Sequence, residues 1–118
     1  MSYSRIGAQL YTLREFTKTP ADIAKTMKKV REIGYEAVQV SGMGPVDPKE
    51  LKKIVDGEGL AIASTHIGFD RMRDQPEAVI EDHQLWGCKH PAIGGMPQNY
   101  RNELGFHDFA KEASEVAK

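Results

Sequence analysis

The strongest constraint on the fold is an alternation, repeated four times along the chain, of a short apolar run and a helical run. The apolar runs predict strands at residues 6–11, 37–41, 60–67 and about 92–95. A strict alternation of strand and helix is typical of a parallel sheet, because parallel neighbours need a crossover connection, and such crossovers are right-handed. The pattern predicts an α/β fold, and no linker divides the chain.

The predicted helices carry clear start and stop signals. The first three open on Thr19 with Pro20, Asp47 with Pro48 and Asp74 with Pro76, and they close near Gly34, Gly59 and Gly87. A polar N-cap before a proline begins a helix well, and glycine favours its end. In the first helix Ile23, Met27 and Val30 share one face, which predicts that this face is buried.

One face of the predicted sheet is polar near the carboxyl ends of its strands. The residues on it are Gln9, Tyr11, Gln39, Ser41, Ser64 and His66, whereas alternation places Ala63, Thr65 and Ile67 on the opposite face of the third strand. Parallel strands covered on both sides normally read apolar throughout. A site in the mouth of a (β/α)8 barrel would need this polar face. Chance polar residues near strand ends are the alternative.

Four strand–helix units make half of a (β/α)8 barrel, which usually takes about 250 residues. The last predicted helix, from about Phe106, has no closing signal, and its stripe of Phe109, Ala113 and Val116 needs a partner surface. A four-stranded sheet would also leave two unpaired edges, which favours association. We therefore expect residues 1–118 to form a single domain, the N-terminal half of a larger barrel, and to form homo-oligomers through the exposed sheet edges.

The charge balance argues against two classes of partner. Sixteen basic residues against seventeen acidic ones leave a net charge of -1, so we expect neither nucleic acid nor a membrane surface as partner. No apolar run is long enough to span a bilayer, and the N-terminus lacks the apolar core of a signal peptide. With a single cysteine, these features predict a reduced, cytoplasmic setting.

Five segments, taken in order, resemble the xylose isomerase-like sugar phosphate isomerase/epimerase family. They are IGAQLYTLR (6–14), VREIGYEAV (30–38), PKELK (48–52), STHIG (64–68) and LWGCK (85–89). The resemblance covers nearly the whole chain and implies a (β/α)8 TIM barrel that isomerises or epimerises a small sugar or polyol by proton transfer next to a carbonyl. Most members of the family use a divalent metal, namely Mn²⁺, Mg²⁺, Co²⁺ or Zn²⁺.

The resemblance also implies which residues do what. In the family, strands of the second half hold the metal and supply the acid and base, so we expect no catalytic residue, no metal ligand and no tightly bound metal in this chain, which alone would be inactive. His66 matches the histidine that ends the third strand, commonly a substrate contact, and Gln9 and Tyr11 match mouth positions of the first strand. Gln39 stands where many members have an acidic residue, which argues against a metal or base role, and we expect it to bind substrate with the others.

The remaining candidates have simpler interpretations. His83 lies on an apolar helix face and is interpreted as structural, whereas Cys88 is expected to pack and His107 to cap a helix. Arg71 and Arg73 could meet an anionic sugar, but solvated loop charges explain them more simply. A structural relative of the family is endonuclease IV, a zinc enzyme that acts on DNA and uses histidines on its third and fourth strands. Residues 92–97 contain no histidine for the fourth strand, which argues against that activity here. The rival to an isomerase is a non-catalytic half-barrel that dimerises or binds a small polyol.

Overall fold

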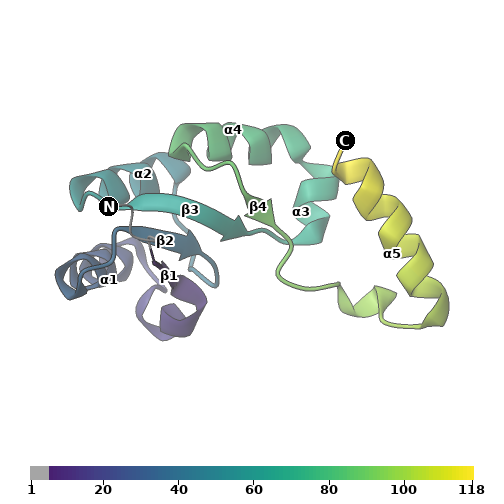
Figure 1. Cartoon of the computed structure of the whole chain (residues 1–118), viewed down its shortest axis with the longest axis horizontal. Helices are drawn as coiled ribbons and strands as arrows, with labels where there is room; N and C mark the ends of the chain where they lie inside the picture. The colour runs from purple at the N-terminus through teal and green to yellow at the C-terminus, as the bar shows by residue number, and fades with distance from the viewer. Residues whose placement is uncertain (1–5) are drawn as a thin grey trace.

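In the computed structural model, which describes residues 6–118, four strands form one parallel sheet in chain order (Figure 1). The strands are β1 (Gly7–Gln9), β2 (Ala37–Val40), β3 (Ala61–His66) and β4 (Pro91–Ala92). The helices are α1 (Pro20–Ile33), α2 (Pro48–Gly57), α3 (Phe69–Asp74), α4 (Pro76–Trp86) and α5 (Glu103–Val116), with 3-10 turns η1 (Leu10–Phe16) and η2 (Gln98–Tyr100). The order β1-β2-β3-β4 is that of half a (β/α)8 barrel, which confirms the predicted α/β fold.

The first two long helices begin where the cap signals predict. The side chain of Thr19 accepts a hydrogen bond from the backbone N–H of Asp22 at 3.2 Å, and Asp47 accepts one from Lys49 at 2.7 Å. A proline follows each cap as the first helical residue. Each cap accepts a hydrogen bond from a backbone N–H that has no partner within the helix. The predicted starts of these two helices are confirmed.

The third predicted helix is divided in two. Phe69–Asp74 forms α3, which the sequence pattern did not predict, and α4 begins at Pro76 after Gln75. Asp74 therefore ends one helix rather than capping the next. No side chain caps α3, so the local signal that revealed the other helices is missing here.

Three further boundaries differ from the prediction. The first strand ends at Gln9, and the predicted residues 10 and 11 belong to η1. β4 is only Pro91–Ala92 instead of about residues 92–95. The last helix begins before Phe106, since the side chain of Asn102 accepts from the N–H of Gly105 at 2.7 Å and caps α5.

A register shift in β3 decides which side chains face the helices. Val38 pairs with Ile62, but the next residue, Gln39, pairs with Ser64, so Ala63 is a surplus residue. Ile62 and Thr65 are consequently both buried, and Ala63 is exposed. The prediction that Ala63 shares the face of Thr65 is therefore wrong, because strict alternation is interrupted here.

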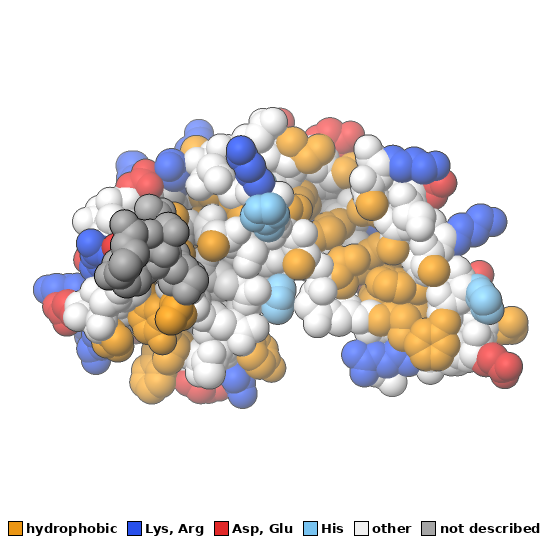
Figure 2. Space-filling model, in the orientation of Figure 1, with side chains coloured by type: hydrophobic (Ala, Val, Ile, Leu, Met, Phe, Trp, Pro, Cys, Tyr) orange, Lys and Arg blue, Asp and Glu red, His pale blue; other side chains and the backbone are white. Residues whose placement is uncertain are grey.

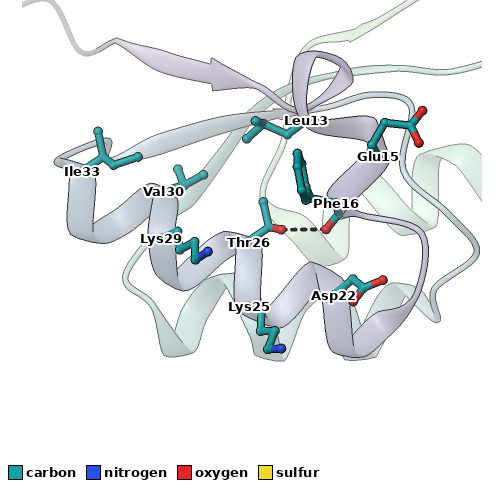
Figure 3. Close-up of a pocket in the computed structure, with 9 residues that line it drawn as sticks. All are labelled: Leu13, Glu15, Phe16, Asp22, Lys25, Thr26, Lys29, Val30 and Ile33. Carbon is teal, nitrogen blue, oxygen red and sulfur yellow. Dashed lines mark hydrogen bonds between the residues drawn. The ribbon is translucent and has the colours of Figure 1, made fainter.

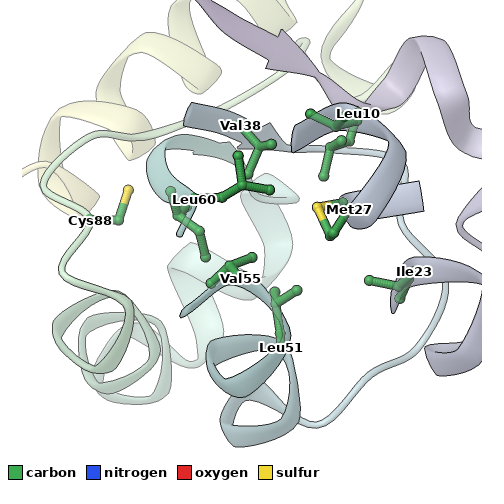
Figure 4. Close-up of a cluster of buried hydrophobic side chains, with 10 residues drawn as sticks. Leu10, Ile23, Met27, Val38, Leu51, Val55, Leu60 and Cys88 are labelled. Carbon is green, nitrogen blue, oxygen red and sulfur yellow. The ribbon is translucent and has the colours of Figure 1, made fainter. Parts of the chain in front are cut away.

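The core lies between the sheet and helices α1 and α2 (Figure 4). It contains Leu10, Ile23, Met27, Val30, Val38, Leu51, Val55, Leu60, Ile62 and Cys88. The predicted stripe of α1 is thus confirmed as a buried face. Burying one apolar side chain of this size stabilises the fold by about 1.5–3 kcal/mol. The cluster as a whole therefore holds α1 and α2 against the sheet.

Helix α5 lies at the far end of the molecule from β1 and packs on α3 (Figure 1). The rings of Phe69, Tyr100 and Phe109 form a second apolar cluster there, with centroids 4.8 to 6.0 Å apart. Figure 2 shows hydrophobic side chains gathered at this end and around η1 at the opposite end. The stripe of α5 therefore has a partner surface in α3, and the described residues include no helix long and apolar enough to cross a membrane.

Candidate functional site

A cavity of about 550 Å³ opens at the carboxyl ends of the strands. Its lining consists of Gln9, Tyr11, Ser41, Gly42, His66, Ile67, Gly68, Gly94 and Gly95. These residues come from β1, β3 and the segments that follow β1 to β4, so the cavity is built by the parts of a parallel barrel that usually carry binding residues. Its lining contains polar groups and glycines but no acidic residue.

The strand register brings three polar residues into one row beside this cavity. Gln9 of β1 pairs with Gln39 of β2, which pairs with Ser64 of β3. All three line an adjoining hollow of about 320 Å³, and Gln9 lines both spaces. Because Ala63 is a surplus residue, Ser64 rather than Ala63 pairs with Gln39. Ser64 therefore lies on the same face of the sheet as Gln9 and Gln39.

A chain of hydrogen bonds links this row to His66. The Nε2 atoms of Gln39 and His66 lie 3.2 Å apart. The hydroxyl of Ser41 donates to Oε1 of Gln39 at 3.5 Å and accepts from the backbone N–H of Tyr11 at 3.1 Å. Three strand ends are thereby tied together around the imidazole of His66.

Tyr11 is held at the rim by its neighbours. It lies on η1 rather than on the strand, and its side chain is 51% exposed. The guanidinium of Arg14 lies over its ring, 4.4 Å from the centroid. Gly42 also lies against Tyr11: a Cβ there would come within 2.7 Å of Cδ2 of the ring, and φ is +64°, so only glycine fits comfortably.

Gly94 forms the wall opposite the strand ends. A Cβ at this position would lie 3.1 Å from Nδ1 of His66 and 3.3 Å from its Cγ. The absence of a side chain therefore lets the loop after β4 approach the imidazole edge. This close approach to His66 is a structural reason for glycine at position 94.

The four predicted substrate residues come together. His66, Gln9 and Tyr11 line one cavity, and Gln39 hydrogen-bonds to His66 from the adjoining hollow. Ser41 was recognised only as part of the polar face, and its place between Tyr11 and Gln39 was missed. The signal was present, because a buried serine directly after a strand needs hydrogen-bond partners.

The other histidine and cysteine candidates lie elsewhere. His83 is 5% exposed, and its ring bonds to the carbonyl of Val79 at 2.7 Å and to Oγ1 of Thr65 at 2.6 Å. This confirms the structural interpretation of His83. Cys88 packs in the core, as predicted, whereas His107 does not cap a helix, since Asn102 caps α5.

The arginines predicted as loop charges are ion-paired on α3. Arg71 lies 2.6 Å from Asp82, and Arg73 bonds to Asp74 at 2.9 Å. Hydrogen bonding to Asp74 raises the pKa of Arg73. Their charges are thus compensated by neighbouring carboxylates, and neither residue lines the cavity beside His66.

The residues around His66 do not fit the divalent metal that the resemblance implies. Hard cations prefer several carboxylate oxygens, and the neighbours of His66 are amides, a hydroxyl and glycines. Within residues 6–118 no three His, Cys, Asp or Glu side chains are grouped so that they could hold a metal ion. The described residues around His66 therefore do not by themselves supply the ligands that such a metal prefers.

A second cavity, of about 430 Å³, lies between η1 and α1, away from the strand ends (Figure 3). Its walls are Leu13, Phe16, Val30 and Ile33, with charged side chains at the rim. The hydroxyl of Thr26 donates to the carbonyl of Phe16 at 2.7 Å and so fixes η1 against the helix. This space is mostly apolar and has no convergent polar groups of the kind that a sugar requires.

The fold and cavity define an α/β half-barrel with a polar surface at the carboxyl ends of its strands. No protein-family model and no curated protein matches the sequence. Among solved structures, the chain is similar to a sugar phosphate isomerase/epimerase from Parabacteroides distasonis ATCC 8503, with a TM-score of 0.67 and 25% sequence identity. The match covers 94% of this chain but only 46% of that protein, which agrees with the predicted half-barrel and confirms the resemblance indicated by the motifs.

Proposed function

We propose that this chain supplies the substrate-binding half of a sugar or polyol isomerase/epimerase of the xylose isomerase-like family. The single observation that carries the proposal is the pairing of His66 with Gln39, 3.2 Å apart, beside a polar cavity at the strand ends of a half-barrel. The similarity to a sugar phosphate isomerase/epimerase supports the same class of ligand. Because the chain spans less than half of that protein, the activity of the whole barrel is part of the proposal.

The described residues would bind and orient the ligand. His66, Gln9 and Gln39 offer hydrogen-bonding groups to ring or chain hydroxyls, and the exposed ring of Tyr11 offers an apolar surface for the carbon face of a sugar. Transfer of a proton next to a carbonyl needs a positioned base. The cavity lining contains no carboxylate to serve as that base, so the chain holds the substrate while the acid and base come from elsewhere in the barrel.

Binding can be tested directly on the 118-residue chain. We expect ketoses, aldoses and polyols to shift the NMR signals of Gln9, Tyr11, Gln39 and His66 in a saturable manner. The matched control is the folded His83→Gln variant, which changes a histidine outside the cavity. Added sugar should shift the signals of the same four residues in this variant. Saturable shifts confined to other residues, or none at the highest soluble ligand concentration, would refute the proposed binding site.

The rival function, a non-catalytic half-barrel that dimerises or binds a small polyol, is favoured by one observation, the lack of an acidic residue in the cavity lining. An isomerase or epimerase that works by the proposed proton transfer exchanges the hydrogen next to the carbonyl with solvent when the base releases it to water. Proton NMR of the sugar in D₂O therefore measures whether the chain alone has this activity. Loss of that signal with the chain alone would contradict the expected inactivity, and binding without exchange is expected of both the isolated half-barrel and the rival.

Adding the missing half of a barrel distinguishes the binding half of an enzyme from the non-catalytic rival. The second half of a related isomerase/epimerase, added in trans, should restore exchange if this chain is the binding half of an enzyme. If both halves fold and associate but exchange stays absent, the rival holds.

A further inference from the structure

We infer that Ser41 and Gln39 are positioning residues that fix the imidazole of His66 in the tautomer with its hydrogen on Nδ1, so that the site presents an N–H donor to an oxygen of the ligand. The inference rests on the proposed function only for the ligand. The tautomer itself is a property of the free chain and follows from three contacts.

The first contact sets the direction of the hydroxyl of Ser41. This residue is only 3% exposed, so its hydroxyl must be satisfied within the protein. Its oxygen already accepts the backbone N–H of Tyr11 at 3.1 Å, an assignment that cannot be reversed because a backbone N–H is always a donor. The hydrogen of the hydroxyl therefore remains available to donate.

The second contact sets the orientation of the Gln39 amide. The hydroxyl of Ser41 donates to Oε1 of Gln39 at 3.5 Å, which places the NH₂ group at the other side of the amide. That NH₂ group lies 3.2 Å from Nε2 of His66. Since an amide nitrogen is a donor and never an acceptor, Nε2 of His66 must accept, and a neutral imidazole that accepts at Nε2 carries its hydrogen on Nδ1.

The third contact shows what Nδ1 faces. His66 and Gly94 line the same cavity, and a Cβ at Gly94 would lie 3.1 Å from Nδ1. The backbone of Gly94 passes beside this atom without a side chain that would cover it, and no hydrogen bond of the described residues involves it. The Nδ1–H group is therefore the free donor of His66.

The consequence is a preference in ligand chemistry. A ligand atom placed beside Nδ1 must accept a hydrogen bond, as a carbonyl, hydroxyl or phosphate oxygen does. An ammonium group at the same place is itself a donor, so neither it nor the Nδ1–H could accept a hydrogen bond from the other. A donor left without an acceptor on binding is costly. We therefore expect a sugar to bind more tightly than the corresponding amino sugar whose nitrogen occupies that position.

The tautomer is measured by long-range proton–nitrogen NMR of the ¹⁵N-labelled full chain, above the pH at which the ring is protonated. We expect the pattern of an Nδ1–H imidazole for His66. The Gln39→Glu variant replaces the donor by a carboxylate, which only accepts, and should switch His66 to the Nε2–H form. The matched control is Gln9→Glu, which adds the same charge to the same cavity without a hydrogen bond to His66 and should leave the tautomer unchanged.

An Nε2–H pattern in the unsubstituted chain would overturn the inference, whatever the variants do. A switch in both glutamate variants would also overturn it, because charge in the cavity rather than the amide would then set the tautomer. These outcomes do not depend on ligand binding. A correct tautomer with no sugar bound would refute the proposed function while leaving the positioning role in place.

Discussion

His66 and His83 both hydrogen-bond to a side chain, yet their surroundings differ. His83 is enclosed between α4 and β3, and both its ring nitrogens have partners in Val79 and Thr65. His66 is half-buried at a strand end, with one nitrogen on Gln39 and the other facing a cavity. Both nitrogens of His83 are therefore hydrogen-bonded within the fold, whereas His66 has one nitrogen without a hydrogen bond to the described residues.

The His66→Gln variant should separate binding from stability. Glutamine keeps a hydrogen-bonding head of similar size, so we expect the free energy of unfolding to change by less than about 1 kcal/mol. Losing one positioned hydrogen bond should lower polyol affinity by between a few-fold and about a hundred-fold. Urea unfolding and NMR titration measure the two effects. A large loss of stability with affinity intact would mean that His66 is structural.

Truncation of His83 should have the opposite effect. In the His83→Ala variant the hydroxyl of Thr65 loses its partner and a cavity forms in the core, so we expect a loss of about 2–4 kcal/mol of unfolding free energy. The control is His90→Ala at an exposed position, which should change stability by no more than about 0.5 kcal/mol. Equal urea midpoints for the two variants would contradict the assigned role of His83.

At the scale of elements, one phenol hydrogen-bonds to side chains of both α3 and α5. The hydroxyl of Tyr100 donates to Oε2 of Glu112 on α5 at 2.5 Å, and Arg73 of α3 donates to the same hydroxyl at 3.3 Å. The hydrogen bond to Glu112, followed by burial, raises the pKa of Tyr100 above its usual 10.0. The folded state therefore favours the neutral phenol, which links α5 to α3.

This shift predicts a loss of stability at alkaline pH. Below pH 10.0 the phenol is neutral in both states and the contribution is complete, and it is lost as the pH rises through the raised pKa of the folded state. We expect the urea midpoint to fall over this range in the unsubstituted chain. The Tyr100→Phe variant should show a smaller fall, and identical pH profiles for the two proteins would exclude this contribution.

The helices were predictable where their signals are local. Thr19 and Asp47 cap α1 and α2 with their own side chains, so a few neighbouring residues determine each boundary. The missed helix α3 has no side-chain cap, and it is held instead by packing of Phe69 on Tyr100 and Phe109, which are distant in sequence. Such contacts cannot be inferred from a local pattern.

The same distinction applies to the candidate site. The polar face could be predicted because alternation along a strand assigns Gln39 to a side of the sheet. The hydrogen bonds from Ser41 through Gln39 to His66 could not, because they depend on the register between β2 and β3, which includes a surplus residue. Register is a property of paired strands, and no single segment encodes it.

At the scale of the whole molecule, both outer strands have one neighbour. β1 pairs only with β2 and β4 only with β3 among the described residues. Exposed apolar side chains lie at both ends, including Ile33 at 74% and Leu104 at 77% exposure. Unpaired edges next to apolar surface favour association, and two copies could together supply eight strands.

We therefore expect the chain to associate in solution. Light scattering coupled to size exclusion should give a mass of at least two copies of the 13.1 kDa chain. Ile33→Glu and Leu104→Glu, at the two ends, should shift the equilibrium toward monomer. Ile80→Glu, at an exposed position of α4, is the matched control and should leave the mass unchanged. A monomer at all concentrations would contradict association.

The surplus residue in β3 has a consequence for how this sequence can change. Removing Ala63 alone would join Ile62 directly to Ser64, two residues that already pair with neighbouring residues of β2, so the ladder would become regular and later side chains would keep their partners. Thr65 would stay on the buried face, and His66 would stay on the face of the cavity. β3 can therefore lose one residue here and keep its register, whereas the loss of a second residue would turn every later side chain to the other face of the sheet.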